Sequence, residues 1–146
     1  NWSKPKMESQ HNLKYWKKEN YLGFGPGASS YLDNNRFTNI RSLKKYIANF
    51  KNSNLQFEEN YILNKNDKLI ENIMLSLRLS EGIKHNEFKE EFNIDFEKSF
   101  SDLIKKLIEY NLLQIDNVST RLTQKGKLLS DSIFLMFEEE IQANPF

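Results

Sequence analysis

Apolar residues in the second half of the chain are spaced as in a series of short helices. From Asp67 to Leu79 they recur three and four residues apart, and Asp67 is of a type that caps helix N-termini. The same spacing predicts a short helix from Asn86 and a longer one over about 97–110. Thr123 is expected to cap a last helix.

A hairpin is predicted between the third and last of these helices. Leu112–Ile115 and Arg121-Leu122 are short apolar runs, and Asp116-Asn117 between them is a turn sequence. Three helices, a hairpin and a closing helix are typical of a winged-helix-like domain. We interpret Phe88, Phe92, Phe96 and Phe100 as core residues rather than a porphyrin-stacking surface, because the run crosses a predicted break at 93–95.

The first 50 residues show a different pattern. We expect a turn or two of helix within 12–19, a short strand over Tyr21–Phe24, and an amphipathic helix over 42–50. One short strand can neither bury its faces nor pair its backbone edges. The segment therefore resembles the end of a larger sheet domain whose earlier strands lie outside this chain.

A glycine turn, Gly23-Phe24-Gly25-Pro26-Gly27-Ala28, follows the predicted strand directly. Glycines at Gly23, Gly25 and Gly27 allow positive φ and close approach of a ligand, and such a turn can aim N–H groups at a carboxylate or phosphate. It is not the dinucleotide fingerprint, since the third glycine comes too early and Pro26 lacks an N–H. On these residues alone, a tight strand-to-loop turn is the favoured interpretation.

Charge divides the 146 residues at the same place. The net charge is +1, but residues 1–50 carry nine basic and three acidic side chains. This asymmetry indicates two segments, 1–50 and 51–146, joined at the polar stretch Lys51–Asn54. The second segment is net negative and lacks the clustered basic face that DNA binding requires.

Composition excludes several classes of protein. The chain has no cysteine, so it has neither a disulfide framework nor a thiolate ligand for zinc or an iron–sulfur cluster. No apolar stretch approaches the roughly 20 residues of a membrane span, and no signal peptide opens the chain. We expect a cytoplasmic protein. The chain begins at Asn1 rather than Met, which favours a piece of a longer protein.

Two histidines are the candidates for ligand chemistry. His85 stands beside Asn86 at a predicted helix entry, where a solvent-facing role is favoured. His11 precedes Tyr15 and Trp16 by four and five residues, so it could combine an axial ligand with a stacking wall for a flat macrocycle. Spacing alone favours a structural histidine there too, but His11 is the best ligand candidate.

Several stretches together resemble the HemN/HemW family, which contains oxygen-independent coproporphyrinogen III oxidase and its haem-chaperone relatives. The similar stretches are His11–Trp16, Tyr21–Tyr31 with Arg36, Glu71–Ile83, Leu112-Leu113 and Arg121–Gly126. They lie in the same order as in the family and span nearly the whole chain. Each is modest alone, and together they are fairly specific.

This resemblance implies a fold and cofactors. Residues 1–50 would be the end of a radical S-adenosylmethionine (β/α) barrel, and 51–146 the helical, winged-helix-like C-terminal domain, giving an α+β, mostly helical chain. The family uses a [4Fe–4S] cluster and S-adenosylmethionine, held by cysteines upstream of the region that this chain resembles. The missing barrel would be this chain's partner in cis, with haem or a porphyrinogen as the bound molecule.

The resemblance also implies site residues. His11, Asn12, Tyr15 and Trp16 are similar to the haem-binding pattern of the chaperone branch, and the glycine turn would lie near the cofactor. Relatives often have a histidine where this chain has Ser29, so no imidazole role transfers there. We expect no catalytic residue in this chain, no radical activity by it alone, and no metal apart from haem iron at His11.

Two classes of function stay open at this point. One is the C-terminal part of a porphyrinogen oxidase or haem chaperone, in which the chain covers or shapes the substrate or haem site, and the chaperone branch is favoured. The other is a stand-alone winged-helix domain that binds protein or DNA, which requires only the C-terminal half.

Overall fold

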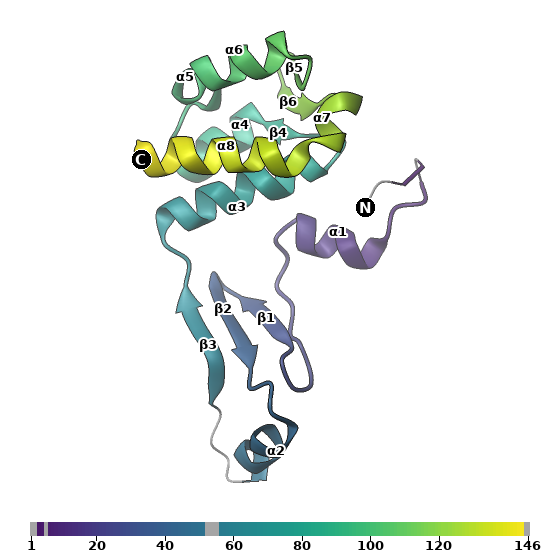
Figure 1. The fold of residues 1–146 in the computed structure, drawn as a ribbon, viewed down its shortest axis with the longest axis vertical. Helices are drawn as coiled ribbons and strands as arrows, with labels where there is room; N and C mark the ends of the chain where they lie inside the picture. The colour runs from purple at the N-terminus through teal and green to yellow at the C-terminus, as the bar shows by residue number, and fades with distance from the viewer. Residues whose placement is uncertain (1–2, 5, 52–55, 145–146) are drawn as a thin grey trace. The chain divides into compact units, whose positions relative to one another are not determined.

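The computed structural model describes residues 3–4, 6–51 and 56–144, and the chain forms two compact units, Asn1–Asn64 and Lys65–Phe146. Figure 1 shows the elements of both, which make a mixed α+β chain that is about half helical, as expected. The boundary between the two units follows Asn64, later in the chain than the predicted boundary at residue 50. Most of the predicted join, Lys51–Asn54, lies outside the described residues.

The N-terminal unit contains a three-stranded antiparallel sheet in the order β1-β2-β3. Its elements are α1 (Gln10–Trp16), β1 (Ser29–Leu32), β2 (Asn35–Asn39), α2 (Leu43–Lys51) and β3 (Phe57–Ile62). The predicted strand at Tyr21–Phe24 is wrong, because within it only Tyr21 pairs, in an isolated bridge to Tyr31. Figure 1 shows α1 and α2 at opposite ends of this sheet.

A two-residue turn joins β1 to β2 and fixes their register. Leu32 pairs with Asn35, and the residues between them, Asp33 and Asn34, have φ of 49° and 67°. Positive φ at both central positions defines the type I′ turn, whose twist matches that of the two strands. Asp and Asn tolerate this region better than most residues, so the local sequence favours the hairpin.

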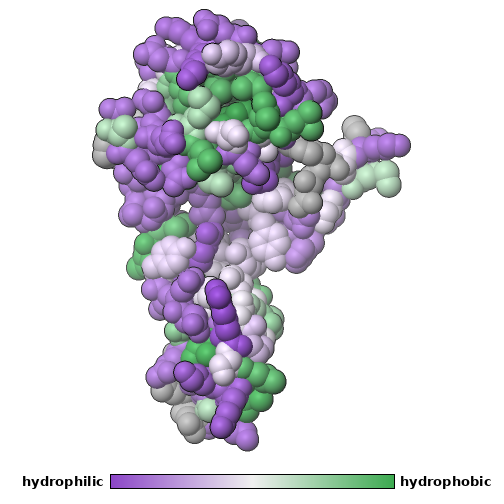
Figure 2. Space-filling view, in the orientation of Figure 1, coloured by the Kyte–Doolittle hydropathy of each residue, from purple (hydrophilic) through white to green (hydrophobic). Residues whose placement is uncertain are grey.

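Few apolar side chains of the N-terminal unit are buried. Among the described residues of the unit, the buried hydrophobic side chains are Tyr31 and Leu63. On α2 the apolar residues predicted to face a core are exposed: Leu43 by 61%, Ile47 by 45% and Phe50 by 58%. Figure 2 shows hydrophobic atoms reaching the surface around α2. The described residues of this unit therefore form no closed hydrophobic core.

The C-terminal unit has the predicted winged-helix-like arrangement, with a three-stranded antiparallel sheet in the order β4-β6-β5. The elements are α3 (Lys65–Arg78), β4 (Ile83–Lys84), α4 (His85–Phe92), α5 (Phe96–Ser99), α6 (Ser101–Glu109), β5 (Leu113–Ile115), β6 (Ser119–Leu122), α7 (Gln124–Leu128) and α8 (Ser130–Ala143). The predicted third helix is divided at Phe100 and the predicted last helix at Leu129. Strand β4 was not predicted.

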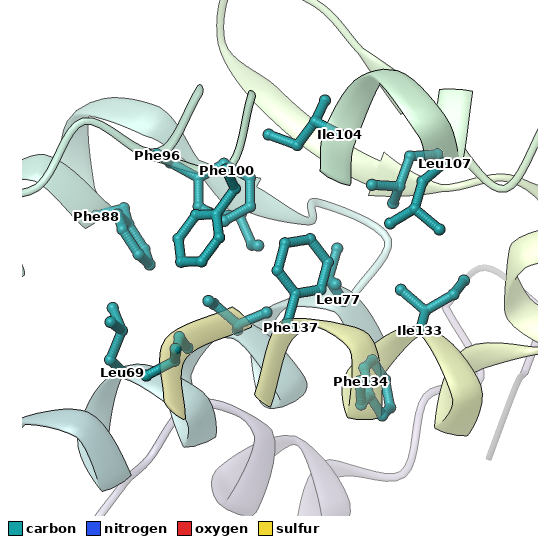
Figure 3. Close-up of a cluster of buried hydrophobic side chains, with 14 of the residues drawn as sticks. Leu69, Leu77, Phe88, Phe96, Phe100, Ile104, Leu107, Ile133, Phe134 and Phe137 are labelled. Atoms are coloured by element: carbon teal, nitrogen blue, oxygen red, sulfur yellow. The ribbon is translucent and has the colours of Figure 1, made fainter. Parts of the chain in front are cut away.

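Side chains from α3, α4, α5, α6 and α8 form the hydrophobic core of this unit (Figure 3). The rings of Phe96 and Phe100 lie 5.8 and 5.4 Å from that of Phe137, between centroids. Phe88 and Phe92 are buried with them. The prediction that the phenylalanine run is core is thus confirmed.

Two residues of the Glu71–Ile83 stretch have clear packing roles. The guanidinium carbon of Arg78 lies 4.9 Å from the ring centroid of Phe134 on α8. Gly82 has a φ of 70°, and a Cβ there would overlap the carbonyl oxygen of Thr120 on β6. The stretch therefore joins α3 to α8 and to the sheet, and its residues are explained by packing.

Candidate functional site

Helix α1 carries all four residues proposed for haem binding. Its N-terminus is capped by the Ser9 hydroxyl, which accepts a hydrogen bond from the backbone N–H of Asn12 at 3.3 Å. The helix ends at Trp16 with Lys17 as its C-cap, and Lys18 then has a left-handed φ of 57°. The local sequence therefore limits the helix to seven residues around His11.

His11 and Tyr15 lie together on one side of α1. Their ring centroids are 4.9 Å apart in an edge arrangement, as expected for residues four apart in a helix. The His11 side chain is exposed, and within the described part of the chain its ring nitrogens make no hydrogen bond or ion pair. A neutral imidazole in this state can offer a nitrogen lone pair to a metal.

Tyr15 connects this helix to the sheet through further aromatic rings. Its ring lies 4.6 Å from that of Tyr21, which lies 6.3 Å from that of Tyr31 on β1. The backbones of Tyr21 and Tyr31 exchange hydrogen bonds of 2.8 and 2.9 Å. The orientation of α1 is thus set by β1. Tyr21 and Tyr31 were not predicted to belong to the site, because their contacts depend on how the chain folds back after α1.

Trp16 and Asn12 are placed differently from His11 and Tyr15. At 3.6 residues per turn, Trp16 lies about 140° around the helix from His11, so the two do not share a face. Trp16 and Asn12 are both half-buried. The structure therefore brings together His11 and Tyr15, and an exposed imidazole beside an aromatic edge fits one axial position of a flat, metal-containing macrocycle.

The backbone N–H groups of the three glycines in the turn all donate hydrogen bonds within the N-terminal unit. Gly23 donates to the Ser30 hydroxyl (3.0 Å), Gly25 to the Tyr46 hydroxyl (3.1 Å) and Gly27 to the Ile40 carbonyl (3.3 Å). Gly25 and Gly27 have φ of 101° and 70°. Backbone geometry explains these glycines, and the N–H groups that would hold an anion are engaged. Proximity of the turn to a cofactor stays a prediction.

His85 is not the solvent-facing residue that the sequence predicted. Its side chain is 13% exposed and stacks on Phe96, with ring centroids 6.4 Å apart. Nε2 lies 2.9 Å from the Thr120 hydroxyl, and Nδ1 lies 3.0 Å from a Glu97 carboxylate oxygen, without hydrogen-bond geometry. The prediction failed because Thr120, on β6, is 35 residues away in sequence.

The turn between β5 and β6 is stabilised by the carboxylate of Asp116. Asp116 accepts hydrogen bonds of 2.9 Å from the N–H groups of both Val118 and Ser119 and pairs with Arg121. The two backbone N–H groups lower the pKa of Asp116, and the Arg121 charge adds to this effect. Asp116 therefore has a structural role in the β5–β6 turn.

Positive charges in the described part of the C-terminal unit have acidic neighbours. Lys105 lies 3.7 Å from Asp102 on α6, and Lys98 lies 3.6 Å from Asp95. The unit carries 11 basic and 15 acidic side chains. Carboxylates beside these two lysines reduce the positive potential that would attract phosphates.

Metal clusters and membrane spans are absent from the part of the chain that the structure describes. Within residues 3–4, 6–51 and 56–144, no group of three or more His, Cys, Asp or Glu side chains is arranged to hold a metal ion. Over the same residues, no helix combines the length and the apolar character needed to cross a membrane.

The C-terminal unit is similar to a known domain family. A family model of the HemN C-terminal domain matches residues 63–129, which lie almost wholly within the C-terminal unit. In solved structures, coproporphyrinogen III oxidase (HemN) from Escherichia coli, a radical SAM enzyme, has the same fold, with a TM-score of 0.69 and 18% identity over 90% of this chain and 34% of that one. The C-terminal unit is thus similar to the HemN C-terminal domain.

Curated relatives extend the likeness to the N-terminal unit. The haem chaperone HemW of Bacillus subtilis is 31% identical over 97% of this chain, and that of Lactococcus lactis is 34% identical over 94%. The chain is therefore homologous to the HemN/HemW proteins. It spans 37% and 36% of the length of these two relatives.

Proposed function

We propose that this chain is the C-terminal part of a HemW-like haem chaperone and that it binds haem through His11. The observation that carries the proposal is the exposed His11 imidazole beside Tyr15, in a chain whose likeness to HemW covers 97% of its length. Haem bound here is cargo. Its iron would supply the open coordination position that an imidazole nitrogen fills.

The residues of α1 would divide the work of holding haem. His11 presents a lone pair to the iron. Tyr15 contacts the His11 ring edge-on and restricts its rotation, and Tyr21 keeps Tyr15 against the sheet. Asn12, next to His11, and Trp16, next to Tyr15, are the other two residues of the proposed haem-binding pattern. Preorganisation of the imidazole in this way lowers the entropy lost on binding.

Radical chemistry, in this proposal, belongs to a longer protein of which this chain is one part. Cleavage of S-adenosylmethionine requires a [4Fe–4S] cluster held by thiolates, and this chain has no cysteine to provide them. Exposed apolar residues of the N-terminal unit, such as Phe24 at 87% and Ile62 at 75%, would face the preceding barrel. The chain would shape the haem site without performing catalysis by itself.

Titration with ferric protoporphyrin IX, monitored at the Soret band, tests the role of His11. We expect His11→Ala to weaken binding about tenfold or more, since it removes the axial ligand. Added imidazole should restore the spectrum of the ligated iron. Gln10→Ala, at an exposed position of the same helix, is the matched control and should bind haem like the unsubstituted chain. An unchanged titration for His11→Ala would remove His11 from the site.

A further inference from the structure

Helix α1 contains one basic residue, Lys14, and no acidic residue. Lys14 lies in its last turn. In the first 50 residues the acidic side chains are Glu8, Glu19 and Asp33. Two of them accept hydrogen bonds: Glu8 from the Lys6 N–H at 3.0 Å, and Asp33 from the Asn20 side-chain amide at 2.9 Å.

Lys14 shares the exposed face of the helix with His11. The two are three residues apart, which places their Cβ atoms about 5–6 Å from each other. Both side chains are exposed, whereas Leu13, Tyr15 and Trp16 are half-buried. Within the described residues, the Lys14 ammonium makes no ion pair. A molecule that met the His11 nitrogen would therefore have a cation close to its edge.

We propose that Lys14 is a specificity-determining residue that pairs with a peripheral carboxylate of the tetrapyrrole bound at His11. This inference rests on the proposed function. Haem is a flat dicarboxylate, so a ligand held at its metal presents its carboxylates at the rim of the ring. The flexible Lys14 side chain, one helical turn from His11, supplies the opposite charge there. The site accordingly prefers tetrapyrroles with ionised carboxylates over esterified ones.

Paired probes test this preference. The full chain is titrated with ferric protoporphyrin IX and with its dimethyl ester, which keeps the iron and lacks the charges. Lys14→Glu should weaken binding of the diacid about three- to tenfold, and the ester should be unaffected. The loss should shrink at high salt, where exposed charges are screened. Lys14→Gln, which suits a helix, should give a smaller loss of the same kind.

Controls separate this inference from the function on which it rests. Lys44→Glu makes the same charge change on an exposed residue of α2, at the other end of the sheet, and should not alter binding. Equal losses for Lys14→Glu and Lys44→Glu would indicate a net-charge effect and overturn the role of Lys14. Binding that depends on His11 but not on Lys14 would overturn this inference alone. If the unsubstituted chain gave no Soret response, both the proposed function and the role of Lys14 would be overturned.

Discussion

At the scale of single residues, His85 joins three elements of the C-terminal unit. It begins α4, stacks on Phe96 of α5 and contacts the hydroxyl of Thr120 on β6. Thr120 is fully buried, so its hydroxyl depends on this imidazole for a side-chain partner. Leaving a buried polar group without a partner costs more than the bond itself contributes.

We expect His85→Ala to lower the free energy of unfolding by about 1–3 kcal/mol, because it removes the Thr120 contact and the ring packed on Phe96. Thr120→Val in the same background should recover part of that loss by eliminating the buried hydroxyl. Urea denaturation of the two single variants and the double variant measures the coupling. Strictly additive effects would mean that the two side chains do not depend on each other.

Local sequence could identify some of these residues but not their surroundings. His11 is recognisable from its spacing to Tyr15, since residues four apart in a helix must be neighbours. The contact between Tyr15 and Tyr21 depends on how the chain returns after α1, and that of His85 depends on β6. A short stretch of sequence therefore could not predict either contact.

At the scale of elements, α7 packs tightly on the loop before β5. Thr123 caps α7 by accepting from the Gly126 N–H at 3.0 Å, as predicted. The Leu112 carbonyl in turn accepts from the Thr123 N–H at 3.0 Å. A Cβ at Gly126 would overlap the carbonyl oxygen of Leu112, so the helix can lie this close only with glycine there.

Gly126→Ala should therefore destabilise the chain. Replacing glycine by alanine within a helix usually gains about 0.5–1 kcal/mol, but overpacking against a fixed backbone atom costs about 1–3 kcal/mol. We expect a net loss, seen as a lower thermal midpoint by circular dichroism. Gln124→Ala, at an exposed position of the same helix, is the control and should change the midpoint little. Stabilisation by Gly126→Ala would contradict the close approach.

Helices were more predictable than strands in this chain. The periodicity over 42–50 and 67–79 matches α2 and α3 closely, because a helix is determined by nearby residues. Strands β1 and β2 were not predicted, because they are rich in polar residues and their polar and apolar residues alternate only weakly. Their signal was the Asp33-Asn34 turn, whose residues tolerate the positive φ that the hairpin requires.

At the scale of the whole molecule, the boundary between units follows from strand pairing. Composition indicated a division near residue 50, where basic residues give way to acidic ones. The sheet extends further, because Phe57–Ile62 pairs with β2, and the N-terminal unit therefore ends at Asn64. Charge describes the surface of a chain, whereas backbone hydrogen bonds decide which residues fold together.

Among the described residues, the large hydrophobic cluster lies within one of the two units. This cluster of buried apolar residues runs from Leu69 to Ile141, within Lys65–Phe146. We therefore expect residues 65–146 to fold as an independent domain, because burial of apolar surface is the main favourable contribution to folding. Residues 1–64, with few buried apolar side chains, should not unfold cooperatively when expressed alone.

Urea denaturation of residues 65–146, compared with the full chain, measures this independence. We expect a single cooperative transition near the same midpoint, with a slope of about 1 kcal/mol/M, as is usual for so small a domain. Near-ultraviolet circular dichroism should report ordered aromatic residues, since Phe96, Phe100 and Phe137 lie inside this unit. Loss of cooperativity in the shortened chain would show that the N-terminal unit contributes to the core, and the assignment of two independent units would then be wrong.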